Sequence, residues 1–151
     1  MVPTLFQDIY TAIQNDSALL AIWDPTSTGT IPVRARFKMA GRDEDFPYIV
    51  YSGKFIQDSH ESGDALGTAF ITFNVYDYQT NASRSLLICR ALKRLFNRKG
   101  MSHMPYYAAT RLFLSSHMNI PTNRENVLRD ELIFKTRYYD NSTAEVLYQD
   151  S

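Results

Sequence analysis

The stretch TAFITFNVYDYQTNASRSLLICRALKRLFNR, residues 68–98, decides the fold, because a long strand pattern runs directly into a helix pattern. In residues 68–78 bulky side chains occupy both alternating rows, which predicts a strand that contacts protein on each face. Residues 83–98 repeat apolar side chains at helical spacing, which predicts an amphipathic helix. Its expected apolar stripe comprises Leu87, Ile88, Ala91, Leu92, Leu95 and Phe96.

Two further helices are predicted upstream of this stretch. Residues 3–15 place apolar side chains at positions i, i+3, i+4 and i+7, which is one face of a helix. Residues 17–23 predict a short second helix, which Ser17 can cap before Asp24-Pro25 ends it. We expect this helix pair to cover the core.

The remaining segments predict strands. Residues 33–38 alternate between apolar and basic side chains, which indicates a half-exposed strand with one basic face. Residues 47–57 predict a strand in which Gly53 marks a bulge or bend. Residues 106–116 and 130–139 predict two more strands.

These elements predict an α+β fold in one domain, residues 1–140. It would contain a mostly antiparallel β-sheet packed on one face by the N-terminal helix and the central amphipathic helix. Residues 141–151 are expected to form a C-terminal tail that needs a partner to become ordered.

Composition narrows the class of protein. The chain has 151 residues, 44% of them hydrophobic, which excludes wholesale disorder. Its 16 basic and 16 acidic residues give zero net charge, which argues against a dedicated basic nucleic-acid-binding domain. The single cysteine excludes an internal disulfide and a multi-cysteine zinc site. We expect neither a secretory signal nor a membrane span, because the N-terminus lacks basic residues and no apolar run is long enough.

Charge is distributed unevenly along the chain. Residues 84–99 carry six basic side chains and no acidic one, whereas residues 40–66 carry six acidic and two basic ones. The bland interpretation is a solubilising helix face and a solvated acidic loop. A functional one is head-to-tail pairing between neighbouring subunits, which generates rings, and we favour it over contact with DNA phosphates. The candidate interface residues are Arg84, Arg90, Lys93 and Arg94 on the helix and Asp43, Glu44 and Asp45 in the acidic loop.

A search for catalytic motifs finds no phosphate-binding loop, nucleophile elbow or zinc-protease motif. His60, His103 and His117 lie in separate segments without a second ligand at helical or hairpin spacing, so we expect no metal site. Cys89 lies on the apolar helix, where a buried small side chain is favoured over a nucleophile. We predict no enzymatic activity and no cofactor, with a small enzyme carrying an unrecognised pocket as the remote alternative.

The order and character of five segments carry a family resemblance. The segments are FQDIYTAIQND, FPYIVYSG, FITFNVYDYQTNASRSLLICRALKRLF, YYAATRLFLSS and ELIFKTRYY. Over residues 3–140 the chain resembles the tail terminator proteins of long-tailed bacteriophages, also called tail completion or head–tail joining proteins. The resemblance implies a non-enzymatic virion protein of the tail neck, assembled in the host bacterial cytoplasm.

The same resemblance implies partners. A ring, expected to be a hexamer, would cap the tail tube protein, stop tube growth and present a surface to the head–tail connector or stopper protein. DNA would pass through its lumen without sequence-specific binding. The loop 58–67 corresponds to the family's tube-contacting region, with Asp58, Ser59, His60, Glu61 and Asp64 as candidate contacts. A head-completion or connector adaptor and a tail tube subunit remain alternatives.

Overall fold

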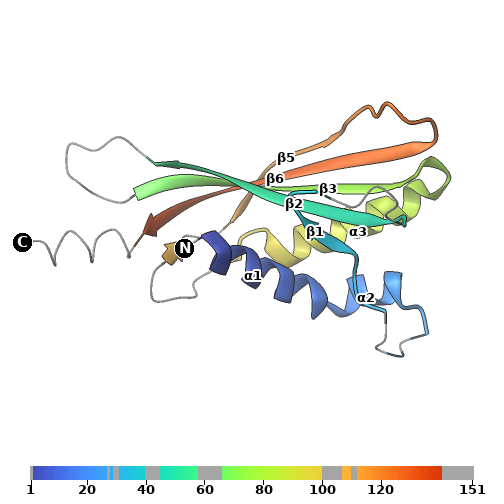
Figure 1. Cartoon of the computed structure of the whole chain (residues 1–151), viewed down its shortest axis with the longest axis horizontal. Helices are drawn as coiled ribbons and strands as arrows, with labels where there is room; N and C mark the ends of the chain where they lie inside the picture. The colour runs from blue at the N-terminus through green and yellow to red at the C-terminus, as the bar shows by residue number, and fades with distance from the viewer. Residues whose placement is uncertain are drawn as a thin grey trace, which may run out of the picture.

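In the computed structural model, the described part of the chain forms one twisted sheet with three α-helices against one of its faces (Figure 1). The structure describes residues 2–26, 28, 31–39, 45–57, 66–99, 107–109 and 112–140. The helices are α1 (Val2–Gln14), α2 (Ser17–Trp23) and α3 (Ala82–Phe96), the last preceded by the 3-10 turn η1 (Gln79–Asn81). The strands are β1 (Ala35–Phe37), β2 (Tyr48–Gln57), β3 (Leu66–Tyr78), β4 (Tyr107–Ala109), β5 (Phe113–Asn119) and β6 (Val127–Asp140).

The sheet is mostly antiparallel, and the predicted α+β class is confirmed. Its order is β1-β2-β3-β6-β4, with β5 also paired to β6. Among the described strands, only the short β1 runs parallel to its neighbour. The long strand β3 lies in the middle and pairs with β2 on one side and with β6, along its full length, on the other.

The two alternating rows of β3 have different surroundings. Ile71, Phe73 and Val75 are fully buried on the side that the helices cover. Phe73 stacks on Phe96 of α3, with ring centroids 5.0 Å apart, and meets Phe134 of β6 edge-on. Because burying apolar side chains of this size contributes about 1.5–3 kcal/mol each, this row fixes which face of the sheet becomes the core.

The apolar stripe of α3 differs from the expected one. Its buried residues are Ser85, Ile88, Cys89, Ala91, Leu92 and Phe96. Leu87 is 52% exposed, so its assignment to the stripe is wrong. At 100° per residue, Leu87 lies 100° around the helix from Ile88 and 140° from Leu92, so it points away from the buried side.

The structure also corrects two smaller sequence expectations. Asp16, not Ser17, caps α2, because its carboxylate accepts a hydrogen bond from the Leu19 backbone N–H at 3.0 Å. Of the bulge or bend expected at Gly53, the bulge is excluded, since Gly53 pairs in register with Ile71 of β3.

The segment predicted as one strand over residues 106–116 is split into β4 and β5, which pair with successive parts of β6. Leu112 lies between them, and its backbone exchanges hydrogen bonds with Arg98 and Lys99 just beyond α3 instead. Its side chain is buried, so anchoring the end of α3 interrupts the strand. The predicted tail 141–151 lies outside the described residues.

Candidate assembly surfaces

The outer face of α3 combines apolar and basic side chains. Leu86 and Leu87 are 54% and 52% exposed. Arg90 and Arg94 follow Leu87 by three and seven residues, so they share its helix face. Leucine and arginine side by side on an exposed face are suited to contact with another protein.

Two of the four basic interface candidates on α3 already have partners within the chain. Arg84 binds Asp77, with its Nε donating to Oδ2 at 2.7 Å, and this hydrogen bond raises the pKa of Arg84. Arg94 donates to both carboxylate oxygens of Asp16, at 2.7 and 2.9 Å. The charge left for a neighbour is therefore smaller than the sequence suggests and centres on Arg90 and Lys93.

The acidic candidates are only partly described. Asp45 is exposed, and its backbone carbonyl accepts a hydrogen bond from Arg34 Nε at 3.0 Å. Arg34 also donates to the backbone carbonyls of Phe46 and Pro47. These hydrogen bonds fix the segment that leads into β2. Pairing between the acidic loop and α3 therefore stays a prediction. Asp43 and Glu44, and the tube-contact candidates Asp58, Ser59, His60, Glu61 and Asp64, lie outside the described residues.

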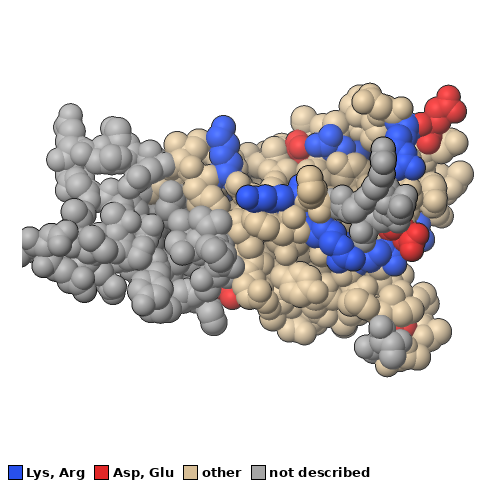
Figure 2. All heavy atoms as spheres, viewed as in Figure 1, with Lys and Arg blue, Asp and Glu red and all other residues tan. Residues whose placement is uncertain are grey.

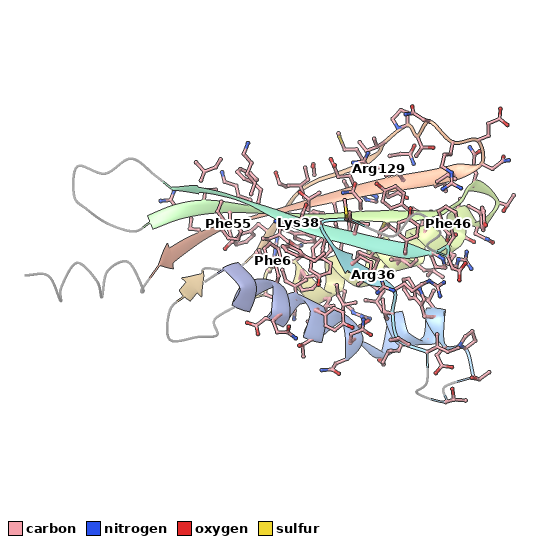
Figure 3. The ribbon with its side chains drawn as sticks, in the orientation of Figure 1. Phe6, Arg36, Lys38, Phe46, Phe55 and Arg129 are labelled. Carbon is pink, nitrogen blue, oxygen red and sulfur yellow. The ribbon has the colours of Figure 1, made fainter. Side chains whose placement is uncertain are left out.

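An aromatic groove of about 650 Å³ lies between α1 and the edge of the sheet. Phe6 and Phe37 meet with ring centroids 4.3 Å apart, and Phe37 is 40% exposed. Figure 3 shows Phe6 reaching from α1 toward β2, with Lys38 and Phe55 beside it. The groove is lined by Phe6, Gln7, Tyr10, Phe37, Lys38, Tyr51, Gly53 and Phe55.

The opposite face of the sheet carries aromatic rings and basic groups. Tyr48 stacks on Tyr76, with ring centroids 4.8 Å apart. Arg129 lies 5.9 Å from the Tyr76 ring centroid and donates to Asn74 Oδ1 at 2.9 Å. Figure 2 shows many more Lys and Arg than Asp and Glu side chains on the visible side of the molecule. By strand register, Lys54, Lys135 and Arg137 share the open sheet face with Arg129, which makes this face a second basic surface.

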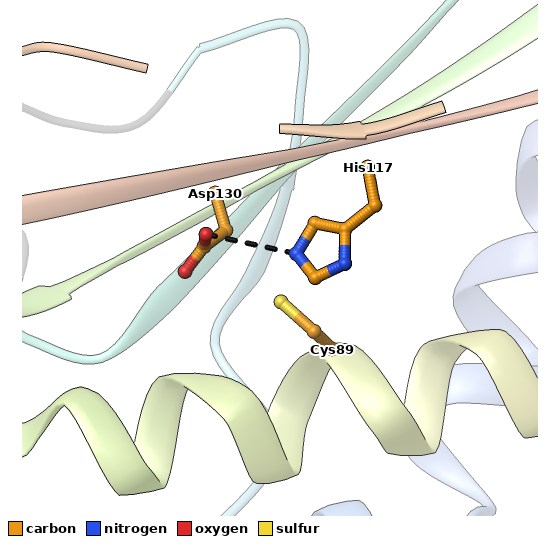
Figure 4. Close-up of side chains that lie close together, drawn as sticks. All are labelled: Cys89, His117 and Asp130. Carbon is orange, nitrogen blue, oxygen red and sulfur yellow. Dashed lines mark ion pairs between the residues drawn. The ribbon is translucent and has the colours of Figure 1, made fainter. Parts of the chain in front are cut away.

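A polar cluster beneath α3 was also missed. Ligating atoms of Cys89, His117 and Asp130 lie within 4.8 Å of one another (Figure 4). His117 Nε2 is 3.6 Å from Asp130 Oδ1, and Ser85 Oγ donates to Asp130 Oδ2 at 2.7 Å.

A register shift explains why His117 joins this cluster. The pairing of β5 with β6 is irregular between Leu114 and Ser116, so that His117 faces Leu132. Leu132 is fully buried on the helix side, and a bulge turns His117 to that same side. An alternation counted along the sequence from the half-buried Leu114 would place His117 on the opposite face.

Cys89 is 1% exposed, so its predicted role as a buried small side chain is confirmed. Burial and the neighbouring Asp130 carboxylate raise the pKa of its thiol to about 12. Since the thiolate is the nucleophile, the cluster is poorly suited to cysteine-based catalysis at neutral pH.

The fold is shared with a virion protein. No family profile and no curated protein matches the sequence. Among solved structures, the chain is similar to one in the structure described as the virion of a native gene transfer agent particle. The TM-score is 0.68 at 12% identity, over 87% of this chain and 91% of the other. At that identity the likeness establishes a common fold over most of both chains.

Among the described helices, none combines the length and the apolar composition that crossing a bilayer requires.

Proposed function

We propose that this protein is a structural subunit of a virion and that it forms the ring that terminates a phage tail. The observation that carries the proposal is the nearly full-length fold similarity to a chain of a gene transfer agent virion. The family resemblance of the sequence supports the finer assignment to the tail neck. In that role, the ring, expected to be a hexamer, contacts the tail tube protein below and the head–tail connector above, and DNA passes through its lumen.

The surface chemistry supports assembly over catalysis. Leu86, Leu87 and Phe37 are large apolar side chains that one subunit leaves half exposed. The outer face of α3 and the aromatic groove lie on different elements, so one copy could present both to different neighbours. A head-to-tail contact between unlike surfaces closes into a ring when the rotation fits a whole number of subunits.

Two alternative functions, both for proteins of the phage tail and neck, differ from the terminator in how assembly stops or in what the ring docks to. A tail tube subunit polymerises indefinitely, whereas a terminator stops at one ring. A head-completion or connector adaptor also forms a single ring but docks to the head side.

The deciding experiment is mass measurement of the purified full-length chain together with negative-stain imaging. We expect discrete rings of about six subunits. Long tubes would favour the tail tube alternative, and a monomer at all concentrations would contradict self-assembly. Added preformed tail tube should then be capped at its ends, whereas binding to connector alone would favour the adaptor.

Matched variants locate the interface. Leu87→Asp should abolish rings because it places a charge in the apolar part of the α3 outer face. Ile56→Asp is the control, because Ile56 is similarly exposed but lies on the open sheet face. Equal loss in both variants would argue against the α3 face as the specific contact.

A further inference from the structure

Cys89, His117 and Asp130 come from three elements, α3, β5 and β6, and meet beneath the helix. Together they present one sulfur, one imidazole nitrogen and one carboxylate oxygen. This mixed donor set suits Zn²⁺, whereas magnesium and calcium prefer oxygen ligands alone.

The spacing of the donors is close to that of a tetrahedral zinc site. Zinc bonds of about 2.0–2.3 Å place ligand atoms roughly 3.3–3.8 Å apart. The 3.6 Å between His117 Nε2 and Asp130 Oδ1 falls within that range. Since all three ligand atoms lie within 4.8 Å of one another, the sulfur needs to approach the other two by at most about 1.0–1.5 Å.

The surroundings orient the donors. Ser85 Oγ donates a hydrogen bond to Asp130 Oδ2. The other carboxylate oxygen, Oδ1, is the one that lies near His117. A hydrogen bond of this kind from outside the ligand set is what holds metal-binding carboxylates in place. The bulge in β5 turns His117 inward, and bulges commonly re-aim a side chain next to a functional site.

We propose that Cys89, His117 and Asp130 bind one Zn²⁺ ion, with water as the fourth ligand. The Cys89 thiol loses its proton to solvent when the metal binds and coordinates as the thiolate. The His117 side chain is 23% exposed, which leaves one side of the site open to that water. The ion ties α3 to the β5–β6 pair, across segments far apart in the chain, and so stabilises the subunit. This site is independent of how subunits assemble.

The test uses the full-length chain with any purification tag removed, because histidine tags bind the same metals. Chelator-treated protein is titrated with Co²⁺ and then with Zn²⁺. We expect one Co²⁺ per chain, an absorption band from charge transfer between thiolate and cobalt, and loss of that band when Zn²⁺ displaces the cobalt. Cys89 is the only cysteine, so the band can come from no other residue. Zn²⁺ should also raise the Tm.

Variants sharpen the test. Cys89→Ser should remove the band, and Asp130→Asn should weaken binding at least tenfold. Ser85→Ala, which removes only the orienting hydrogen bond, should weaken it roughly tenfold. Glu131→Gln is the matched control, because it removes a neighbouring carboxylate on the open sheet face and should leave binding unchanged.

The result that overturns the proposal requires no variant. Wild-type protein that takes up no Co²⁺, or takes it up without the thiolate band, does not have this site. Binding equal in wild type and Asp130→Asn would overturn it as well.

Discussion

Asp77 and Asp130 are carboxylates buried beneath α3, and consecutive residues of that helix bind them. Arg84 pairs with Asp77, and Ser85 donates to Asp130. An unpartnered buried carboxylate is costly, so these contacts favour one register of the helix along the sheet over a slip by one turn. These contacts between individual residues therefore specify the position of α3 on the sheet as well as stabilising it.

Arg84→Ala should lower the free energy of unfolding by about 2–3 kcal/mol, because it leaves Asp77 buried without its counter-charge. Arg84 is itself about one-third exposed, which keeps the effect below that of a fully buried pair. Chemical denaturation measures it. Arg90→Ala, which removes an exposed arginine of the same helix, should change stability by less than about 0.5 kcal/mol. An equally small effect for Arg84→Ala would show that the pair contributes little.

Gly53 faces Phe6 so closely that a Cβ added there would lie 2.5 Å from the Phe6 ring. Gly53→Ala should therefore displace the ring and cost about 1–3 kcal/mol, read as a lower Tm. Phe6 also packs on Phe37, so the ring cannot move without losing that contact. Gly53→Ala combined with Phe6→Leu should cost less than the sum of the two single changes. Strict additivity would contradict the proposed clash.

At the scale of elements, the side chain of Asp16, between α1 and α2, links α2 to α3. Asp16 caps α2 through the Leu19 N–H and also binds Arg94 of α3. The cap is a local contact, whereas the ion pair joins residues 78 positions apart. Arg94 is 57% exposed, so solvent screens the pair.

Asp16→Ala should lower the free energy of unfolding by about 1 kcal/mol through loss of the cap. Asp16→Asn keeps a capping oxygen and loses the charge, so it should be nearly neutral. Denaturant midpoints of the two variants separate the cap from the ion pair. A loss in Asp16→Asn as large as that in Asp16→Ala would assign the stabilisation to the ion pair instead.

At the scale of the whole molecule, zero net charge conceals basic surfaces within the described part of the chain. Some of the basic charge of α3 is neutralised within the chain by Asp77 and Asp16. The basic charge of α3 that is not paired with a described carboxylate centres on Arg90 and Lys93, beside exposed leucines. The open sheet face adds Arg129 and Lys135 as further cations. Assembly through α3 should therefore be partly electrostatic.

Reversing charge at Arg90 and Lys93 to Glu should weaken ring formation and change its dependence on salt, measured by mass across a range of ionic strength. Lys135→Glu, on the open sheet face, is the control. Rings with unchanged stability and unchanged salt response would exclude electrostatic pairing through α3. Arg94 is left intact in this test because reversing it would also disturb the Asp16 contact.

Sequence periodicity was sufficient to predict the main helices and strands. The 3.6-residue and two-residue repeats correctly indicated α1, α3, β2, β3 and β6, because each repeat reflects burial of one face along a single segment. The apolar stripe of α3 was predicted incorrectly at Leu87, which is apolar yet exposed. The role as a tail terminator stays a proposal beyond the shared fold.

By itself, the sequence determined the α+β class, because local patterns encode the type and order of the elements. The tertiary structure decided which row of the central strand the helices bury. Only the tertiary structure decided which distant polar groups meet. Asp77 with Arg84, and Cys89 with His117 and Asp130, depend on strand register and on a bulge in β5. One residue of register reverses the face of every following side chain, and no local repeat in the sequence records that shift.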